Sequence, residues 1–194
     1  MAVKLVRPIN YRSVANISAL DFQNIMQDLK VRKDFAVAIS GGPDSLALVL
    51  LSEQYAKEND LKLTALSVDH SLRPNSKDEI KWVEKLMRRN KIKFAYLKLK
   101  GKKPNSNIMA YAREQRYDLL TKYCKRSKIP YLLTAHHLDD EIENFLMRLI
   151  RGSGIKGLSS SRSSFKHRKS GVNIVRPLLS FSKKSLIKYL SLKK

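Results

Sequence analysis

The chain has 194 residues, 43% of them hydrophobic, which is enough to bury the core of one domain. Its 39 Lys and Arg against 17 Asp and Glu give a net charge of +22, which favours a polyanionic partner, nucleic acid first. No apolar run approaches the ~20 residues of a membrane-spanning helix, and Cys124 is the only cysteine, so we expect no membrane partner, no internal disulfide and a reducing cytoplasmic location.

The first part of the chain is predicted to be an extension followed by a strand, a turn and a helix. Residues 1–30 are interpreted as an N-terminal extension, because their first seventeen residues lack the apolar segment of a signal peptide. Phe35–Ile39 is a short apolar run that ends in glycines, which predicts a buried strand and a turn. Ser45–Lys57 carries apolar residues at helical spacing and predicts the helix.

Strand and helix patterns then alternate. Further strands are predicted over Leu63–Val68, Lys93–Leu99 and Pro130–Thr134, and helices over Ser76–Asn90, Asn107–Lys125 and Asp139–Arg151. Gly152–Gly171 is rich in Gly, Ser, Lys and Arg and shows little periodicity, so we predict a mobile basic loop. Val172–Val175 predicts one more strand, and Ser182–Leu190 predicts a last helix capped by Ser182.

This repeated β–α pattern predicts an α/β fold, a Rossmann-like parallel sheet with helices on both faces. We expect one catalytic domain over residues 31–180, followed by a C-terminal helix in residues 181–194. Ligands of such sheets bind beyond the carboxyl ends of the strands. Functional motifs are therefore expected where strands end.

The turn after the first predicted strand has the composition of an anion site. It consists of Ser40, Gly41, Gly42, Pro43, Asp44 and Ser45. Two glycines let backbone N–H groups approach an anion closely, and the following helix adds its positive N-terminal end. The serines can donate hydroxyl hydrogen bonds, and Asp44 can hold Mg²⁺ against phosphate oxygens. An ordinary Gly-rich turn is the alternative, but the six residues together favour a pyrophosphate site.

Two further motifs carry charge near this turn. Asp69 ends the second strand, where an acid can address the adenosine part of a nucleotide. Arg113 and Arg116 lie three residues apart on one face of a helix, as a cationic fork for phosphate. A solvated basic face explains the two arginines equally well.

The segment Ala135–Asn144 holds two histidines and four carboxylates. Asp140 and Glu143 share a helix face, and His136 lies one turn before Asp140, so the three could converge on a cationic amine. A metal site is the other interpretation, and we rank it lower because a magnesium–ATP enzyme needs no separate transition-metal centre. His137 is expected to point elsewhere or to be structural.

These motifs, taken in order, resemble the N-terminal catalytic domain of the tRNA(Ile)-lysidine synthetase family, within the PP-loop ATP pyrophosphatases. The resemblance spans roughly Asp34 to Leu190 and includes S-G-G-P-D-S, V-D-H-S-L-R, A-R-E-Q-R-Y, T-A-H-H-L-D-D-E-I-E-N, R-L-I-R-G-S-G-I-K-G-L and V-R-P-L-L. It implies that ATP adenylates the C2 oxygen of the wobble cytidine in an isoleucine tRNA with a CAU anticodon. The ε-amine of free lysine then displaces AMP to form lysidine.

The resemblance also implies roles for individual residues. It implies an ATP site made of Ser40, Gly41, Gly42, Pro43, Asp44, Ser45 and Asp69, with Asp44 holding Mg²⁺. It implies catalytic roles for Asp44, Arg113, Arg116 and Asp140. It implies lysine recognition by His136, Asp140 and Glu143, and tRNA contacts from Arg148, Arg151 and Lys156.

The chain departs from the family in two respects. Glu141 and Asn144 stand where the family usually has Gln and Thr. Most members continue into further domains that grip the tRNA, whereas this chain stops at Lys194, so residues 181–194 are interpreted as a truncated C-terminal helix. The alternatives are another PP-loop tRNA-modifying enzyme, such as a thiolase, which the single Cys124 disfavours, and a truncated, non-catalytic RNA-binding remnant. A homodimer is the candidate assembly.

Overall fold

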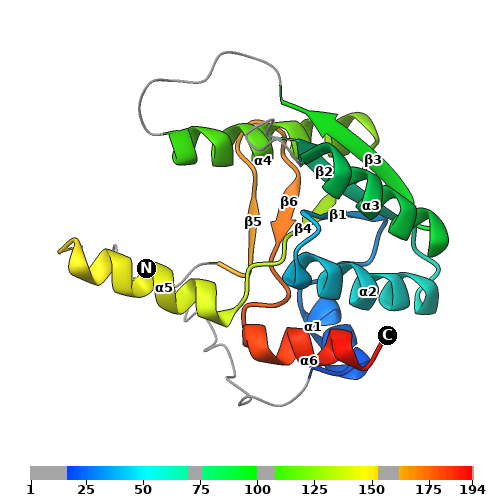
Figure 1. Ribbon diagram of the computed structural model, residues 1–194, viewed down its shortest axis with the longest axis horizontal. Coiled ribbons are helices and arrows are strands. Elements are labelled where there is room, and N and C mark those ends of the chain that lie inside the picture. Colours follow the sequence, from blue (N-terminus) through cyan, green and yellow to red (C-terminus); the bar gives the residue numbers. More distant parts are fainter. Residues whose placement is uncertain (1–16, 70–75, 100–107, 153–161, 194) are drawn as a thin grey trace, which may run out of the picture.

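A six-stranded sheet organises the part of the chain that the computed structural model describes, which is residues 17–69, 76–99, 108–152 and 162–193 (Figure 1). The strands are β1 (Phe35–Ala38), β2 (Leu63–Asp69), β3 (Lys93–Lys98), β4 (Tyr131–Leu133), β5 (Ser164–Lys166) and β6 (Asn173–Val175). They lie in the order β3-β2-β1-β4-β6-β5, and each neighbouring pair is parallel except β5 and β6. The carboxyl ends of the parallel strands therefore meet at one edge.

Helices cover both faces of this sheet, as the sequence predicted. The helices of the described part are α1 (Ala19–Asp28), α2 (Pro43–Glu58), α3 (Ser76–Arg89), α4 (Ile108–Arg126), α5 (Leu138–Ile150) and α6 (Lys183–Ser191), of which α5 does not pack on the sheet. Phe35 and Val37 of β1 pack into the core shared with α1, α2, α3 and α6, whereas Ala36 packs into the core shared with α4. Side chains alternate between the faces of a strand, and both faces are apolar here because both are covered. The predicted α/β fold is confirmed.

Helix α1 is part of the main core. Phe22 is 1% exposed and Met26 is fully buried, and the ring of Phe22 meets that of Tyr55 on α2 edge to face, with centroids 6.4 Å apart. Ser18 caps the helix and forms a capping box with Asp21. The boundary expected at residue 30 therefore does not separate α1 from the main hydrophobic core, and residues 1–16 lie outside the described part of the chain.

The segment predicted as a continuous loop contains a strand. Residues 164–166 form β5, which pairs antiparallel with β6 through Phe165 and Ile174. Lys169 ties the turn between the two strands to α4, because its Nζ lies 2.7 Å from Asp118 Oδ2. The loop prediction was therefore wrong for these residues, since a three-residue strand is too short to show a period. Residues 153–161 lie outside the described part.

Four helices end in the same backbone conformation. The residues after α1, α2, α3 and α4 have positive φ, at Lys30 (56°), Asp60 (53°), Lys91 (55°) and Lys128 (57°). The next amide then donates back to the last helical turn, as Ile129 N does to the carbonyl of Cys124 at 2.8 Å. Each helix is thereby closed two to five residues before the next strand of the sheet begins.

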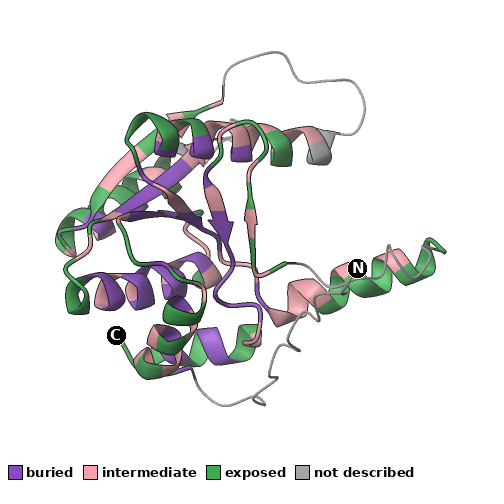
Figure 2. Ribbon diagram, turned by 180° about the vertical axis from the view of Figure 1, so that it is seen from behind, coloured by how far each residue is buried: buried purple, intermediate pink, exposed green. Residues whose placement is uncertain are grey.

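Helix α5 differs from the other helices. It contains no buried residue and projects from the body of the protein (Figures 1 and 2). Its first turn is nevertheless anchored, because Leu138 N donates to the carbonyl of Phe181 at 2.9 Å and Lys183 N donates to Asp139 Oδ2 at 2.7 Å. The start of α5 is thus held against the start of α6.

Candidate active site at the carboxyl edge of the sheet

A cavity of about 460 Å³ opens where β1, β2 and β4 end. Its walls come from Ser40 after β1, Asp69 at the end of β2 and Thr134 after β4, with α4 contributing Arg116. Strand-end residues meet there because the three strands run parallel and in register. The cavity therefore lies at the edge of the sheet where the sequence predicted the functional motifs.

The turn after β1 is shaped by its glycines and braced by its serines. Gly41 has φ of +86°, and a Cβ at this position would lie 3.3 Å from Val83 Cγ2 on α3, so a larger residue would be both strained and crowded. Gly42 is the N-cap of α2, which starts with Pro43. The Ser45 hydroxyl accepts from Ser40 N at 3.2 Å and donates to the carbonyl of Gly42 at 2.9 Å. These hydrogen bonds join the turn to the first turn of α2.

Asp44 lies in the first turn of α2 and lines the cavity. Its Oδ1 is buried and has no hydrogen-bond partner, while its Oδ2 lies 3.6 Å from Nε2 of His137. A buried carboxylate oxygen without a donor fits a hard cation such as Mg²⁺, which binds one or two carboxylates and completes its shell with water and phosphate oxygens. The described residues contain no group of three or more His, Cys, Asp or Glu side chains suited to a metal ion.

Asp69 is held in place by a neighbouring strand. It is 4% exposed, and its Oδ2 accepts a hydrogen bond of 2.5 Å from the hydroxyl of Tyr96 on β3. Burial, together with the hydrogen bond to this carboxylate, raises the pKa of Tyr96 to about 12, so the hydroxyl remains a donor at neutral pH. Residues 70–75, which complete the predicted motif, lie outside the described part.

His136, which follows β4, also lines the cavity. Its Nδ1 lies 3.1 Å from Thr134 Oγ1. Burial, and after it the positive charges of Arg176, Arg113 and Arg116, lower the pKa of His136 to about 3. The imidazole is therefore neutral at physiological pH and can accept a hydrogen bond from a cationic amine.

The structure brings only part of the predicted amine cluster into the cavity. Asp140 lines it, and its Oδ2 also accepts from His137 N at 3.0 Å, so this carboxylate both caps α5 and faces the site. Glu143 is exposed and is not among the residues that line the cavity. Asp140 and Glu143 lie on the same face of α5, as their spacing predicted. Because α5 leaves the body of the protein after its first turn, only Asp140 reaches the cavity.

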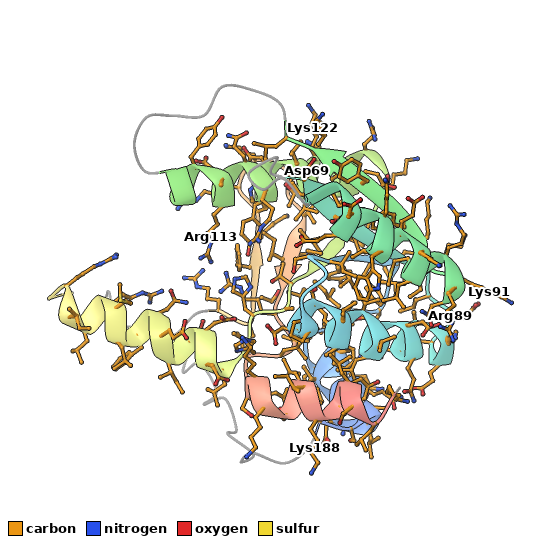
Figure 3. All side chains as sticks on the ribbon, viewed as in Figure 1. Asp69, Arg89, Lys91, Arg113, Lys122 and Lys188 are labelled. Carbon is orange, nitrogen blue, oxygen red and sulfur yellow. The ribbon has the colours of Figure 1, made fainter. Side chains whose placement is uncertain are left out.

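Of the predicted basic residues in the described part, only Arg116 lines the cavity. Arg116 lines the cavity, and its guanidinium lies over the ring of Tyr117 at 5.6 Å. Arg113 is exposed, and Figure 3 shows it pointing from α4 toward the side on which α5 lies. Arg148 and Arg151 lie at the far end of α5, and Lys156 falls outside the described residues.

Two residues beside the cavity were given no role in the site by reasoning from the sequence. His137 is 5% exposed and caps α5, which agrees with its structural interpretation, but its Nε2 also lies 3.6 Å from Asp44 Oδ2. Arg176 follows β6 and is 8% exposed; its guanidinium lies over the ring of Phe165 at 5.0 Å, and its Nε has no hydrogen-bond partner. The rule that sites lie at strand ends, applied to the last strand, would have found Arg176.

Comparisons with known proteins agree with this fold. The profile of the PP-loop domain family matches residues 14–194. A tRNA(Ile)-lysidine synthase from Rickettsia typhi is 44% identical over 155 residues, which cover 80% of this chain and 35% of the relative, and one from Wolbachia pipientis wMel is 43% identical over 175 residues, which cover 88% and 40%. The chain thus spans between a third and two fifths of the length of these curated relatives.

A solved structure gives an independent comparison of the fold. The U34-tRNA thiolase NcsA from Methanococcus maripaludis, determined with its [4Fe-4S] cluster, superposes with a TM-score of 0.75 at 23% identity over 90% of this chain and 63% of that chain. This similarity concerns the fold alone. Within the described residues, no helix is both long and apolar enough to cross a membrane.

Proposed function

The chain belongs to the PP-loop domain family, and from this premise we propose that it ligates lysine to the wobble cytidine of a tRNA(Ile) with a CAU anticodon. ATP would be converted to AMP and pyrophosphate through an adenylated tRNA. The observation that carries the proposal is that one cavity is lined both by the PP-loop carboxylate Asp44 and by the pair His136 and Asp140. The names of the curated relatives, tRNA(Ile)-lysidine synthase, support the same reaction.

In the first step, the cytidine C2 oxygen bonds to the α-phosphorus of ATP and pyrophosphate leaves. Backbone N–H groups of the turn and the N-terminal end of α2 would hold the pyrophosphate, and Asp44 Oδ1 would hold Mg²⁺. A bound cation would neutralise the charge that develops on the leaving group. Arg116 in the cavity and Arg113 near its mouth would balance charge on the α-phosphate.

In the second step, the lysine ε-amine bonds to C2 and AMP leaves. The neutral imidazole of His136 and the carboxylate of Asp140 would accept hydrogen bonds from the ammonium group, and so position it beside the adenylate. An amine must lose a proton to act as a nucleophile, and the Asp140 carboxylate is the acceptor we assign. Glu143, which is exposed, would meet the incoming lysine outside the cavity.

The tRNA is supported as a partner by charge. A net charge of +22 attracts a polyanion, and Arg148, Arg151 and Lys156 come after the cavity-lining residues in the sequence. We place the reaction in the cytoplasm, where tRNA and free lysine are available. Another PP-loop tRNA-modifying enzyme and an RNA-binding remnant without turnover remain the rival proposals, and the first experiment distinguishes all three.

The experiment supplies ATP, Mg²⁺, radiolabelled lysine and an isoleucine tRNA transcript with a CAU anticodon, and measures AMP release and label in the tRNA. We expect both signals to require lysine, and neither signal with an Asp44→Ala variant or with a transcript whose wobble base is uridine. AMP release that ignores lysine would indicate another modification. Tight tRNA binding with no AMP release would contradict the proposed ligation.

We also propose that two copies of the chain pair through α5. Its exposed apolar face consists of Ile142, Phe145, Leu146 and Leu149, which are 45% to 52% exposed. An antiparallel pair would bury this face and would set the acidic first turn of one helix against the basic end of the other. Sedimentation equilibrium tests this pairing: Leu146→Glu should yield a monomer, whereas the same change at Leu20 on α1 should leave a dimer. A monomeric unmodified chain would refute it.

A further inference from the structure

His137 lies close to two carboxylates that line the cavity. Its Nε2 lies 3.6 Å from Asp44 Oδ2 on the phosphate side and 3.8 Å from Asp140 Oδ2 on the amine side. The residue is 5% exposed and forms the N-cap of α5, whose first turn is anchored to the start of α6. It therefore occupies a fixed position between the PP loop and the residues assigned to lysine.

The neighbours of the imidazole determine which nitrogen carries its proton. Nδ1 accepts from Asp140 N at 3.4 Å as part of the capping box. Asp139 Oδ2 is farther from Nδ1, at 3.6 Å, and already accepts from Lys183 N at 2.7 Å. An imidazole whose Nδ1 accepts carries its proton on Nε2 when neutral, so Nε2 is then a donor that lies 3.6 Å from Asp44 Oδ2.

The two oxygens of Asp44 then have different surroundings. Oδ2 lies 3.6 Å from Nε2 of His137, whereas Oδ1 is buried with no hydrogen-bond partner. Carboxylates that bind metal ions are commonly oriented by a hydrogen bond to the oxygen that does not face the metal. The separation of 3.6 Å exceeds a hydrogen bond, and contacts of this kind shorten when the ligands of an active site bind.

We propose that His137 is a positioning residue that turns the Asp44 carboxylate so that Oδ1 faces the bound metal–nucleotide. Because the same imidazole caps α5, it also fixes the carboxylate of Asp140 relative to the PP loop. The inference rests on the proposed use of magnesium and ATP by this site. In this inference His137 connects the PP loop, which carries Asp44, with the start of α5, which carries Asp140.

Two substitutions separate capping from contact with Asp44. In His137→Asn the amide oxygen takes the place of Nδ1, and Asn is a strong N-cap, but the side chain ends before the position of Nε2. In His137→Gln the amide nitrogen reaches toward the position of Nε2, but Gln is a poor cap. The first variant keeps the helix start and loses the Asp44 contact, and the second does the reverse.

The binding experiment uses the full chain and a non-hydrolysable ATP analogue with a methylene between its α and β phosphates. Mn²⁺, as a spectroscopic substitute for Mg²⁺, is titrated into the nucleotide complex and followed by electron paramagnetic resonance, with thermal unfolding measured in parallel. We expect His137→Asn to keep the wild-type Tm and to weaken Mn²⁺ binding by about 10- to 100-fold. His137→Gln should lower Tm and bind Mn²⁺ more tightly than His137→Asn does.

The outcomes separate this inference from the proposed function. If the wild-type complex binds Mn²⁺, Asp44→Ala does not, and His137→Asn binds as the wild type does, the positioning role is overturned while the ATP site stands. If the wild type binds neither nucleotide nor Mn²⁺, the proposed function fails and this inference fails with it. A loss in His137→Asn that Gln restores in part supports the positioning role, because a purely structural effect would follow Tm instead.

Discussion

Acidification should destabilise this protein through His136. Burial, and then the charges of Arg176, Arg113 and Arg116, hold the pKa of this residue at about 3 in the folded chain, against 6.5 for an ordinary histidine. Below pH 6.5 His136 becomes protonated in the unfolded chain but stays neutral in the folded chain. The stability contributed by neutral His136 is therefore fully present above pH 6.5 and is lost progressively as the pH falls toward 3.

The size of the effect follows from the gap between the two pKa values. At pH 5 the unfolded histidine has been protonated over about 1.5 pH units while the folded one has not, so the loss is about 2 kcal/mol at 1.36 kcal/mol per unit. With a urea slope of ~2 kcal/mol/M, the unfolding midpoint should fall by about 1 M from this residue alone. The Asp and Glu residues and the other histidines add their own contributions.

The assay isolates His136 by comparing two chains at two pH values. Urea unfolding of the wild type and of His136→Gln is followed by circular dichroism at pH 7 and pH 5. Between pH 7 and pH 5 the free energy of unfolding of the wild type should fall by about 2 kcal/mol more than that of the variant, because Gln does not titrate and both chains share every other titratable group. Equal losses in the two chains would show that His136 is not buried as a neutral group, and would remove the basis for its role as an acceptor.

Three further predictions address the fold and the site. Phe22→Ala should cost about 3–5 kcal/mol and lower Tm by about 6–20 °C, whereas Leu20→Ala on the same helix should change little, and similar Tm values would mean that α1 is an appendage. Lys128→Gly should add about 0.5–1 kcal/mol in urea unfolding because its φ is 57°, and a loss would show a different helix end. Asp140→Asn keeps the cap of α5 and should raise the apparent KM for lysine by about tenfold or more. Glu143→Gln should raise it by less than about threefold. A larger increase in KM for Glu143→Gln than for Asp140→Asn would place Glu143 inside the site.

Local patterns predicted most of the secondary structure. Each buried strand of a covered parallel sheet is apolar on both faces, so Phe35–Ile39 and Pro130–Thr134 stood out as short continuous runs. Helix starts were legible where the capping residue is adjacent, as at Ser182, whose hydroxyl accepts from Ser185 N at 3.3 Å. Signals of this kind depend on neighbours within about four residues, and the sequence displays them directly.

Interactions between segments far apart in the sequence could not be predicted from local patterns. Strand β5 exists because it pairs with the edge of β6 and because Lys169 meets Asp118 on α4, and three residues carry no period. The sequence predicted a helix over Asp139–Arg151, but not that α5 leaves the body and exposes its apolar face. A period identifies an apolar face but does not say what covers it.

The sequence by itself predicted the chemistry of this site. Only the tertiary structure decided which of the predicted residues line the cavity. Ser40–Ser45 and the acids after β4 were recognisable because glycines, carboxylates and histidines at strand ends have few structural explanations in combination. Whether Asp140 or Glu143 faces the cavity, and that His137 contacts Asp44, depended on where α5 leaves the sheet. That exit is set by hydrogen bonds to Phe181 and Lys183, more than forty residues away along the chain, where no local pattern reaches.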